Sequence, residues 1–341
     1  MRTKTIEIKN LSIGYSSKNH KKVIASNITA DIYSSELTCL LGVNGVGKST
    51  LLKTLSAFLP KIGGTIKILK KDLDNYNDKQ LSTVLSVVLT DKCNIRNMSV
   101  EELVGLGRSP YTDFWGTIRH DDKKIVKRAM QMVRIDSLAT RMVQTLSDGE
   151  RQKVMIAKAL AQSTPIIYLD EPTAFLDYPS KVEIMQLLHT LSRQTGKTIF
   201  MSTHDLELAL QIADKIWLMD KTNGINIGVP EDLSVNGSLS HFFARKGISF
   251  DKETGLFRIE NECRKKVKLT GHGQRYAMIR KALFRNDILA GREIESAINI
   301  ETGCSKDDLR LILHMPEKDI SLSNIEELLV AIKYGDLLED I

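Results

Sequence analysis

The stretch GVNGVGKST, residues 42–50, constrains the fold of this chain more than any other part of the sequence. It follows the short apolar run CLLGV and opens into KSTLLKTLSAFL, whose leucines recur at helical spacing. Glycines let successive backbone N–H groups converge on phosphate oxygens, and the N-terminus of a helix adds positive potential. A strand, a glycine-rich turn and a helix in this order therefore predict a phosphate-binding loop.

The residues of this loop have separate roles in holding a nucleotide. In loops of this kind the lysine, here Lys48, reaches the β and γ phosphates, and the following hydroxyl, here Ser49, coordinates Mg²⁺. We expect ATP and Mg²⁺ as the ligands. The candidate ATP-binding residues of the loop are Gly42, Asn44, Gly45, Val46, Gly47, Lys48, Ser49 and Thr50.

A second chemical feature is PIIYLDEP at 165–172, an apolar run that ends in two carboxylates. Asp170, at the end of a strand beside the phosphate loop, can hold Mg²⁺, and Glu171 can accept a proton from an attacking water. Acidic pairs are common in proteins. By itself this pair is only suggestive of a metal site, because a buried strand that ends in a solvated acidic turn is the more frequent case.

Strands alternate with helices through most of the first 230 residues. Apolar runs at 85–90, 198–205 and 215–220 are typical of buried strands, and the segments between the strands have helical periodicity. Residues 99–144 lack strand patterns, and we interpret them as an inserted helical block. The alternation predicts a mainly parallel sheet in an α/β core.

Three more motifs stand in a fixed order around the acidic pair. LSDGERQKVMIAKALAQ precedes it, whereas AFLD at 174–177 and TIFMSTHD at 198–205 follow it. With the phosphate loop, these motifs resemble the signature, the D-loop and the switch histidine of ABC-type ATPases. The resemblance covers roughly residues 5–230. It implies an α/β fold: a P-loop ABC-type nucleotide-binding domain with an inserted helical subdomain at about 95–160.

The resemblance implies a role for each matching residue. Tyr15, in LSIGY, resembles the aromatic residue that stacks on adenine in this family. Asp170 would hold Mg²⁺, Glu171 would be the general base, and His204 would contact the γ-phosphate. The implied activity is ATP hydrolysis.

The signature residues would act on a second copy of the chain. In the family they reach the γ-phosphate of the nucleotide that the other subunit binds, and here the matching residues are Ser147 and Gly149. ATP would thus hold a homodimer together, and hydrolysis would open it.

Two positions depart from the family pattern. The usual signature LSGGQ is LSDGE here, because Asp148 and Glu150 replace a glycine and a glutamine. Acidic groups at this place are expected to weaken nucleotide binding in trans. The family also has a glutamine that senses Mg²⁺ at the end of the strand before the helical subdomain, and Thr90 takes its place. The shorter Thr90 is expected to couple to the metal through a water.

Within the helical block, VEELVGLGRSPYTDFWG is similar to a segment of the importer ATPases for iron-siderophore, haem and cobalamin uptake. The similarity rests chiefly on GRSPY at 107–111 and on Phe114 and Trp115. It implies that this face docks an integral membrane permease, with a periplasmic or surface substrate-binding protein as an indirect partner. The cargo stays open among the three classes.

The pattern of strands and helices in the sequence indicates that the last part of the chain forms a separate unit. Residues 231–250 are expected to be a linker, and 251–341 a smaller accessory α/β domain that ends in a helix capped by Ser321 or Ser323. Its role is not indicated. The cluster of Lys and Arg at 264–285 is typical of a solvated basic face.

Composition excludes several classes. The net charge of +6 is mild and nucleic acid is not an expected partner, while four scattered cysteines suggest reduced thiols in a cytosolic protein. With no apolar stretch of about 18 residues, the chain is not expected to span a membrane by itself. The resemblance to importer ATPases implies that it lies peripherally on the cytoplasmic face of the inner membrane. The alternative is a soluble ABC ATPase that acts on nucleic acid or the ribosome. Such proteins usually carry coiled-coil insertions or two cassettes, and this sequence has neither.

Overall fold

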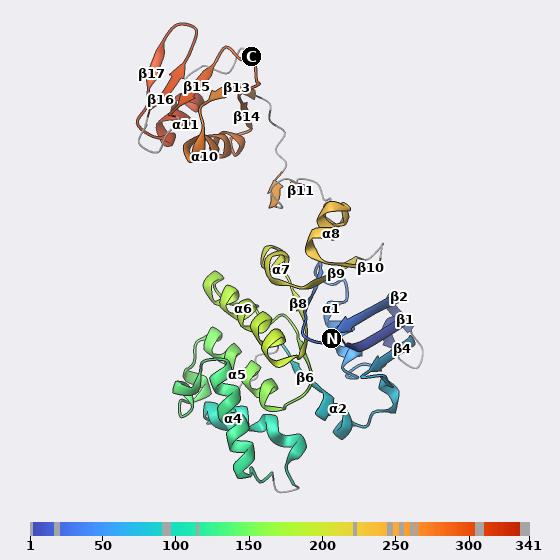
Figure 1. The fold of residues 1–341 in the computed structure, drawn as a ribbon. Coiled ribbons are helices and arrows are strands. Elements are labelled where there is room, and N and C mark those ends of the chain that lie inside the picture. Colours follow the sequence, from blue (N-terminus) through green and yellow to red (C-terminus); the bar gives the residue numbers. More distant parts are fainter. Residues whose placement is uncertain are drawn as a thin grey trace. The chain divides into compact units, whose positions relative to one another are not determined.

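The computed structural model describes residues 3–16, 21–90, 97–113, 116–220, 224–243, 248–251, 256–259, 263, 265–303 and 310–334. The chain forms two compact units, Met1–Phe242 and Phe243–Ile341 (Figure 1). The first unit extends past residue 230. Residues 231–242, which we expected to be part of a linker, therefore belong to the first unit.

A six-stranded sheet forms the centre of the first unit, in the order β10-β9-β3-β8-β7-β6. All neighbours pair in parallel except β9 and β10. Strands β7 and β8 are buried along their whole length, which explains why their sequences are continuous apolar runs rather than alternating ones. The strands are β3 (Leu37–Gly42), β6 (Leu85–Val88), β7 (Ile166–Leu169), β8 (Thr198–Thr203), β9 (Lys215–Asp220) and β10 (Gly224–Gly228).

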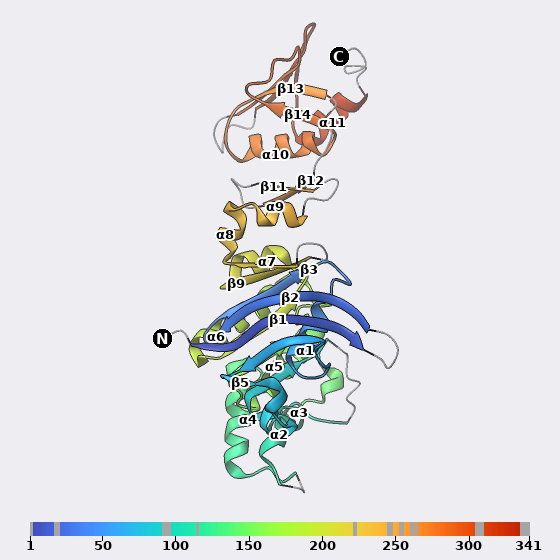
Figure 2. The same cartoon turned by 90° about the vertical axis from the view of Figure 1, so that its right-hand side faces the viewer.

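A separate antiparallel sheet contains the N-terminal strands in the order β2-β1-β4-β5 (Figure 2). In the second half of β2 buried residues alternate with more exposed ones, because one face packs on the core and the other faces solvent, whereas register shifts interrupt this alternation in β1. One hydrophobic cluster joins this sheet to the parallel sheet, with Phe200 packed edge-on against Tyr168 and Trp217. The strands are β1 (Lys4–Ser16), β2 (Lys21–Tyr33), β4 (Gly63–Ile68) and β5 (Lys71–Asp72).

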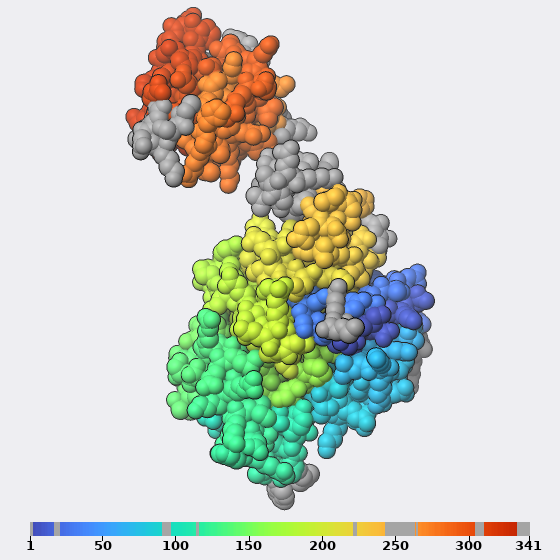
Figure 3. Space-filling view, in the orientation of Figure 1, coloured from blue at the N-terminus to red at the C-terminus, as the bar shows by residue number. Residues whose placement is uncertain are grey.

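The predicted helical block lies at the expected place, between β6 and β7. It contains α3 (Val100–Gly105), α4 (His120–Met132) and α5 (Asp148–Ala161), which contact one another. In the space-filling view the green residues of this block and the blue residues of the antiparallel sheet occupy different sides of the first unit (Figure 3). The other helices are α1 (Lys48–Leu55), α2 (Asp78–Val84), α6 (Tyr178–Thr195), α7 (Leu206–Ile212), α8 (Pro230–Val235) and α9 (Ser238–Phe243).

The second unit is α/β, as predicted. Its five-stranded sheet has the order β14-β13-β15-β16-β17, and β13 pairs in parallel with both of its neighbours. Helices α10 (Gly273–Phe284) and α11 (Ile325–Tyr334) contribute to one hydrophobic core with this sheet. The strands are β11 (Ile248–Asp251), β12 (Leu256–Ile259), β13 (Lys265–Thr270), β14 (Ile288–Gly291), β15 (Asn299–Thr302), β16 (Leu311–His314) and β17 (Asp319–Ser321).

The predicted serine cap of the C-terminal helix is wrong. The side chain of Asn324 accepts the N–H of Glu327 at 2.8 Å, and the Glu327 carboxylate accepts the N–H of Ser323 at 2.8 Å. The helix begins at Ile325, so Asn324, the residue directly before it, is the one placed to cap it.

Two further sequence expectations concern thiols and membrane spans. Cys39 and Cys263 are free, and Cys93 and Cys304 lie outside the described residues. Among the described helices, none has both the length and the apolar character needed to cross a bilayer.

Candidate nucleotide-binding site

The candidate site lies at one edge of the parallel sheet. Strand β8 lies between β3 and β7, and all three run in parallel, so their carboxyl ends meet at the same edge. The phosphate loop follows β3, Asp170 follows β7 and His204 follows β8. Ligands of open α/β sheets bind at such an edge.

Two glycines of the loop are required by its geometry. A Cβ at Gly42 would lie 2.7 Å from Val46 Cγ1 and 2.9 Å from the Met219 carbonyl oxygen. Gly47 has φ of 116°, and a Cβ there would lie 2.5 Å from Ile24 Cγ2. Gly47 is the N-cap of α1, no side chain caps this helix, and its first turn has no acidic residue. The positive end of the α1 dipole is therefore available to an anion.

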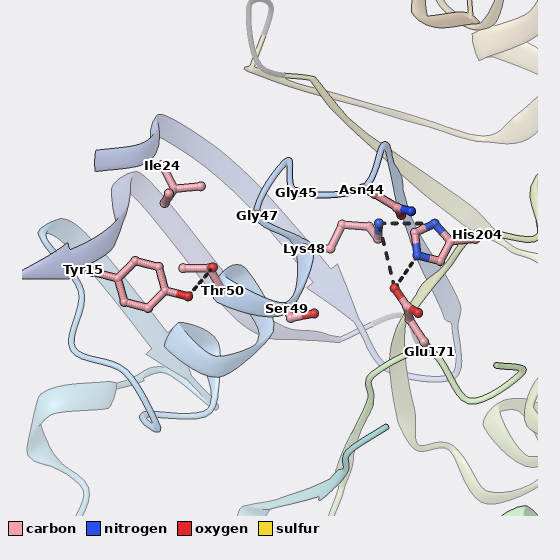
Figure 4. A pocket seen from close by; sticks show the side chains of 10 residues that line it. All are labelled: Tyr15, Ile24, Asn44, Gly45, Gly47, Lys48, Ser49, Thr50, Glu171 and His204. Carbon is pink, nitrogen blue, oxygen red and sulfur yellow. Dashed lines mark hydrogen bonds and ion pairs between the residues drawn. The ribbon is translucent and has the colours of Figure 1, made fainter. Parts of the chain in front are cut away.

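Lys48 is held at the centre of the site. Its side chain is 5% exposed, and its Nζ donates to the Gly42 carbonyl at 2.9 Å. The ammonium lies 3.4 Å from His204 Nδ1 and 4.0 Å from Glu171 Oε1 (Figure 4). Burial lowers the pKa of Lys48, and the nearby carboxylates of Glu171 and Asp170 oppose this shift. Lys48 thus brings a poorly solvated positive charge to the loop.

Glu171 and His204 form a close pair. His204 Nε2 lies 2.5 Å from Glu171 Oε1, and Figure 4 shows both side chains turned toward Lys48. Glu171 has φ of 47°, a left-handed conformation that is uncommon for a residue with a side chain. These three side chains come from segments that follow three different strands, because Lys48 begins α1 after β3 and the phosphate loop, whereas Glu171 follows β7 and His204 follows β8.

A cavity of about 490 Å³ brings most of the predicted residues together. Gly42 and Val46 shape the loop but do not line the cavity. The hydroxyl of Tyr15 lies 3.3 Å from Thr50 Oγ1, and Tyr15 is half exposed; its stacking on adenine stays a prediction. The lining residues are Tyr15, Ile24, Asn44, Gly45, Gly47, Lys48, Ser49, Thr50, Glu171 and His204.

The proposed metal position has oxygen donors. Asp170 is 9% exposed, and its Oδ1 accepts hydrogen bonds from Ser49 Oγ at 3.2 Å and from Ser202 Oγ at 2.7 Å. Within the described residues, no three His, Cys, Asp or Glu side chains cluster in a way that could hold a metal by themselves. A carboxylate and a hydroxyl fit Mg²⁺, which prefers oxygen and takes further ligands from phosphates and water.

Thr90 lies next to the acidic pair without lining the cavity. Its Oγ1 donates to the backbone carbonyl of Asp170 at 2.7 Å. The hydroxyl proton of Thr90 is thus directed to the backbone, and a water-mediated contact with Mg²⁺ stays a prediction.

The two signature residues lie at the N-terminus of α5. Ser147 Oγ accepts the N–H of Glu150, while the Glu150 carboxylate accepts the N–H of Ser147 at 2.9 Å. Neither Ser147 nor Gly149 lines the cavity of the same chain. Glu150, noted in the sequence as a departure from the family, completes a capping box.

Part of the GRSPY segment has a structural role. Arg108 is 6% exposed, bonds Asp122 at 2.9 Å and donates to the Ala161 carbonyl at 2.8 Å. It therefore ties α4 to the end of α5. Tyr111 stays 40% exposed, and Phe114 and Trp115 lie outside the described residues.

Sequence reasoning missed two residues of the site. Ile24 lines the cavity, and Ser202 bonds the acidic pair from inside the sheet. A serine within the apolar strand TIFMST was a usable signal, because a buried hydroxyl needs a partner. Ile24 had no such signal, since its position follows from the pairing of β2 with β1.

The fold and the loop define a P-loop nucleotide-binding protein. A family model described as ABC transporter matches residues 25–174, and one described as iron ABC transporter C-terminal domain matches residues 264–333. A Methanocaldococcus jannaschii ABC transporter ATP-binding protein is 36% identical over 264 residues, which are 77% of this chain and 90% of that protein. The chain belongs to the family of ABC transporter ATP-binding proteins, and it is an ATPase of that class.

Two more similarities concern transport of metal complexes. The ferric enterobactin transport ATP-binding protein of Escherichia coli is 33% identical over 223 residues, 65% of this chain and 81% of that protein. A chain from a metal-chelate type ABC transporter in an inward-facing conformation superposes with a TM-score of 0.62 at 26% identity. That match covers 76% of this chain and 97% of the other. Both predictions, of the family and of its fold, are confirmed.

Proposed function

We propose that this chain is the ATP-hydrolysing subunit of an importer that carries an iron complex, a siderophore or haem, or cobalamin through a membrane permease. The observation that carries the proposal is the grouping of Lys48, Glu171 and His204 beside the phosphate loop. It provides a phosphate-binding cation, a carboxylate base and a histidine in contact with that base.

In the proposed reaction, a water attacks the γ-phosphate of ATP. Glu171 Oε1 accepts the proton of this water, and His204, in contact with the same oxygen, orients the carboxylate. Lys48 faces the β and γ phosphates. Ser49 and Asp170 would hold Mg²⁺, which neutralises charge on the phosphate oxygens when it is bound.

The dimer is part of the same proposal. Ser147 and Gly149 lie apart from the cavity of their own chain, which fits a role at the nucleotide of a second copy. The Ser147 hydroxyl oxygen accepts a bond from Glu150, so its proton is still able to donate to a phosphate oxygen. ATP would then lie between two copies.

The cargo class is supported by the relatives and by the second unit. The proteins named above are described by ferric enterobactin transport and as metal-chelate type, and the C-terminal unit matches an iron ABC transporter family. The chain would act peripherally on the cytoplasmic face of the inner membrane, with a substrate-binding protein outside as an indirect partner. The exposed Leu106, Tyr111 and Ile118 of the helical block fit a surface that docks the permease.

The substitution Glu171→Gln tests the catalytic assignment. It removes the base and keeps the shape, so we expect ATP binding to persist and hydrolysis to slow by roughly 10²–10⁴-fold. Size-exclusion chromatography with ATP should then show a trapped dimer. Glu207→Gln, at an exposed position in the first turn of α7, is the control and should behave as wild type. Normal turnover in Glu171→Gln would place the base elsewhere.

The transport assignment needs the permease. With the chain and its permease in proteoliposomes, we expect ATP-dependent uptake of radiolabelled ferric siderophore, haem or cobalamin, and none with Glu171→Gln. Uptake of only one of them identifies the cargo. ATPase activity that RNA or ribosomes stimulate, without uptake of any of the three, would favour the non-transport alternative.

A further inference from the structure

Ser202 is a buried polar residue that strand pairing places beside the acidic pair. It lies in β8, is 0% exposed, and follows the apolar run Ile199–Met201. The parallel register pairs Leu169 of β7 with Met201 of β8. One residue further along, the same register puts Ser202 next to Asp170.

The Ser202 hydroxyl makes two hydrogen bonds to consecutive residues. It donates to Asp170 Oδ1 at 2.7 Å and accepts the backbone N–H of Glu171 at 2.9 Å. On the neighbouring side Thr90 Oγ1 donates to the Asp170 carbonyl at 2.7 Å. The carboxylate and carbonyl of Asp170 and the amide of Glu171 are thus each held by a hydroxyl.

This arrangement matters because Glu171 has an unfavourable backbone conformation. Its φ of 47° is the left-handed region, which a glutamate occupies only when its surroundings hold it there. The bond from the Glu171 N–H to Ser202 is one such restraint. The conformation in turn directs the carboxylate toward His204 and Lys48 (Figure 4).

We infer that Ser202 is a positioning residue for ATP hydrolysis, which sets the Asp170 carboxylate and the Glu171 backbone with a single hydroxyl. It does not touch the nucleotide, since it does not line the cavity. It acts through the two carboxylates, and the inference therefore rests on the roles proposed for Asp170 and Glu171. Loss of this hydroxyl is expected to lower the rate of the chemical step rather than the affinity for ATP.

The substitution Ser202→Ala tests this inference with full-length protein. The hydroxyl bonds a charged group, so we expect kcat to fall about ten- to a hundredfold, while KM for ATP changes less than about threefold. The Mg²⁺ concentration for half-maximal hydrolysis should rise, because Asp170 loses one of its two hydroxyl partners.

Ser86→Ala is the matched control. Ser86 is also buried, at 1% exposed, in β6 on the other side of β7, but it bonds Thr164 at 3.0 Å instead of the acidic pair. We expect its melting temperature to fall as much as that of Ser202→Ala, with kcat and Mg²⁺ dependence unchanged. Ser202→Cys keeps the side-chain volume and has only a weak S–H donor, so its kcat should lie between wild type and Ser202→Ala.

The double variant Ser202→Ala with Glu171→Gln separates this inference from the proposed function. If Ser202 acts through Glu171, the double variant should be little slower than Glu171→Gln alone. Fully multiplicative losses together with an unchanged Mg²⁺ dependence, or a kcat of Ser202→Ala within twofold of wild type, overturn the inference. If Ser202→Ala does not fold, an unchanged kcat of Ser202→Cys overturns it. Normal turnover in Glu171→Gln instead overturns the proposed base, whatever Ser202 does.

Discussion

The N-termini of α1 and α5 are both predicted to face nucleotide phosphates, yet they are built differently. Helix α1 begins after Gly47, with no side-chain cap and no acidic residue in its first turn. Helix α5 begins after Ser147, with a complete capping box and two acidic residues in its first turn, Asp148 and Glu150. The first is open to an anion, whereas the second satisfies its own backbone groups and carries negative charge.

This difference indicates that the N-termini of α1 and α5 contribute unequally to nucleotide binding. The α1 end, with Lys48 beside it, has the charge and free dipole to bind ATP within one chain. The α5 end contributes the Ser147 hydroxyl against the repulsion of its acidic neighbours. We therefore expect tight binding of ATP by one copy and a weak, easily reversed ATP-driven dimer.

The largest expected effect comes from removing the cation at the α1 end. Lys48→Ala should weaken ATP binding on the order of 100-fold, because it removes the charged partner of the phosphates. Isothermal titration calorimetry measures this loss. Lys53→Ala, which removes a lysine from the last turn of the same helix, is the control and should bind ATP as wild type does. Near-normal affinity in Lys48→Ala would mean that the open helix end alone binds the phosphates.

A smaller effect is expected from making the α5 end less negative. Glu150→Gln removes one charge but keeps a side chain that can accept the Ser147 N–H, so the capping box persists. In the Glu171→Gln background, the ATP-bound dimer should tighten about two- to fivefold, as measured by analytical ultracentrifugation.

The matched control for this change is Glu102→Gln. Glu102 completes the same type of capping box with Ser99 at the start of α3. It is outside the signature and should leave the dimer unchanged. Equal tightening by both substitutions would show that net charge, rather than the α5 terminus, limits association.

The smallest expected effect is a pH dependence of stability at α5. The hydrogen bond from the Ser147 N–H, together with the nearby Arg141, holds the pKa of Glu150 below its ordinary value of 4.5. A lowered pKa in the folded state means that this stabilisation is complete above about pH 4.5 and is lost as the pH falls through the lowered value. The difference in melting temperature between wild type and Glu150→Gln should therefore shrink between about pH 6 and about pH 3. A constant difference would contradict the capping role of the charge.

The sequence predicted those residues of the site that can be recognised from their neighbours along the chain. The phosphate loop, Asp170 and Glu171 lie directly after strands with plain apolar patterns, so their place at the sheet edge was predictable. The capping box at α5 was also readable, because a serine stands three residues before Glu150. We instead interpreted Glu150 only as a departure from the family signature.

Other features of the fold were not predictable from local pattern. The N-terminal strands were not expected to form a sheet of their own, because alternation predicts a strand but not its partner. Residues 224–228 begin and end with glycine, a pattern that does not predict a strand, yet they form β10 against β9. Pairing with an already folded strand outweighs the weak strand propensity of this segment.

The sequence by itself determined the order of the motifs and therefore the family, the phosphate loop and the two α/β units, since these depend on spacing along the chain. Only the tertiary structure decided which groups hold the acidic pair. Ser202 lies 31 residues from Glu171, and Thr90 lies 80 residues from Asp170. They meet those partners because β8 and β6 flank β7 in a defined register. That register is a property of the assembled sheet, in which the central strands β7 and β8 are buried along their whole length.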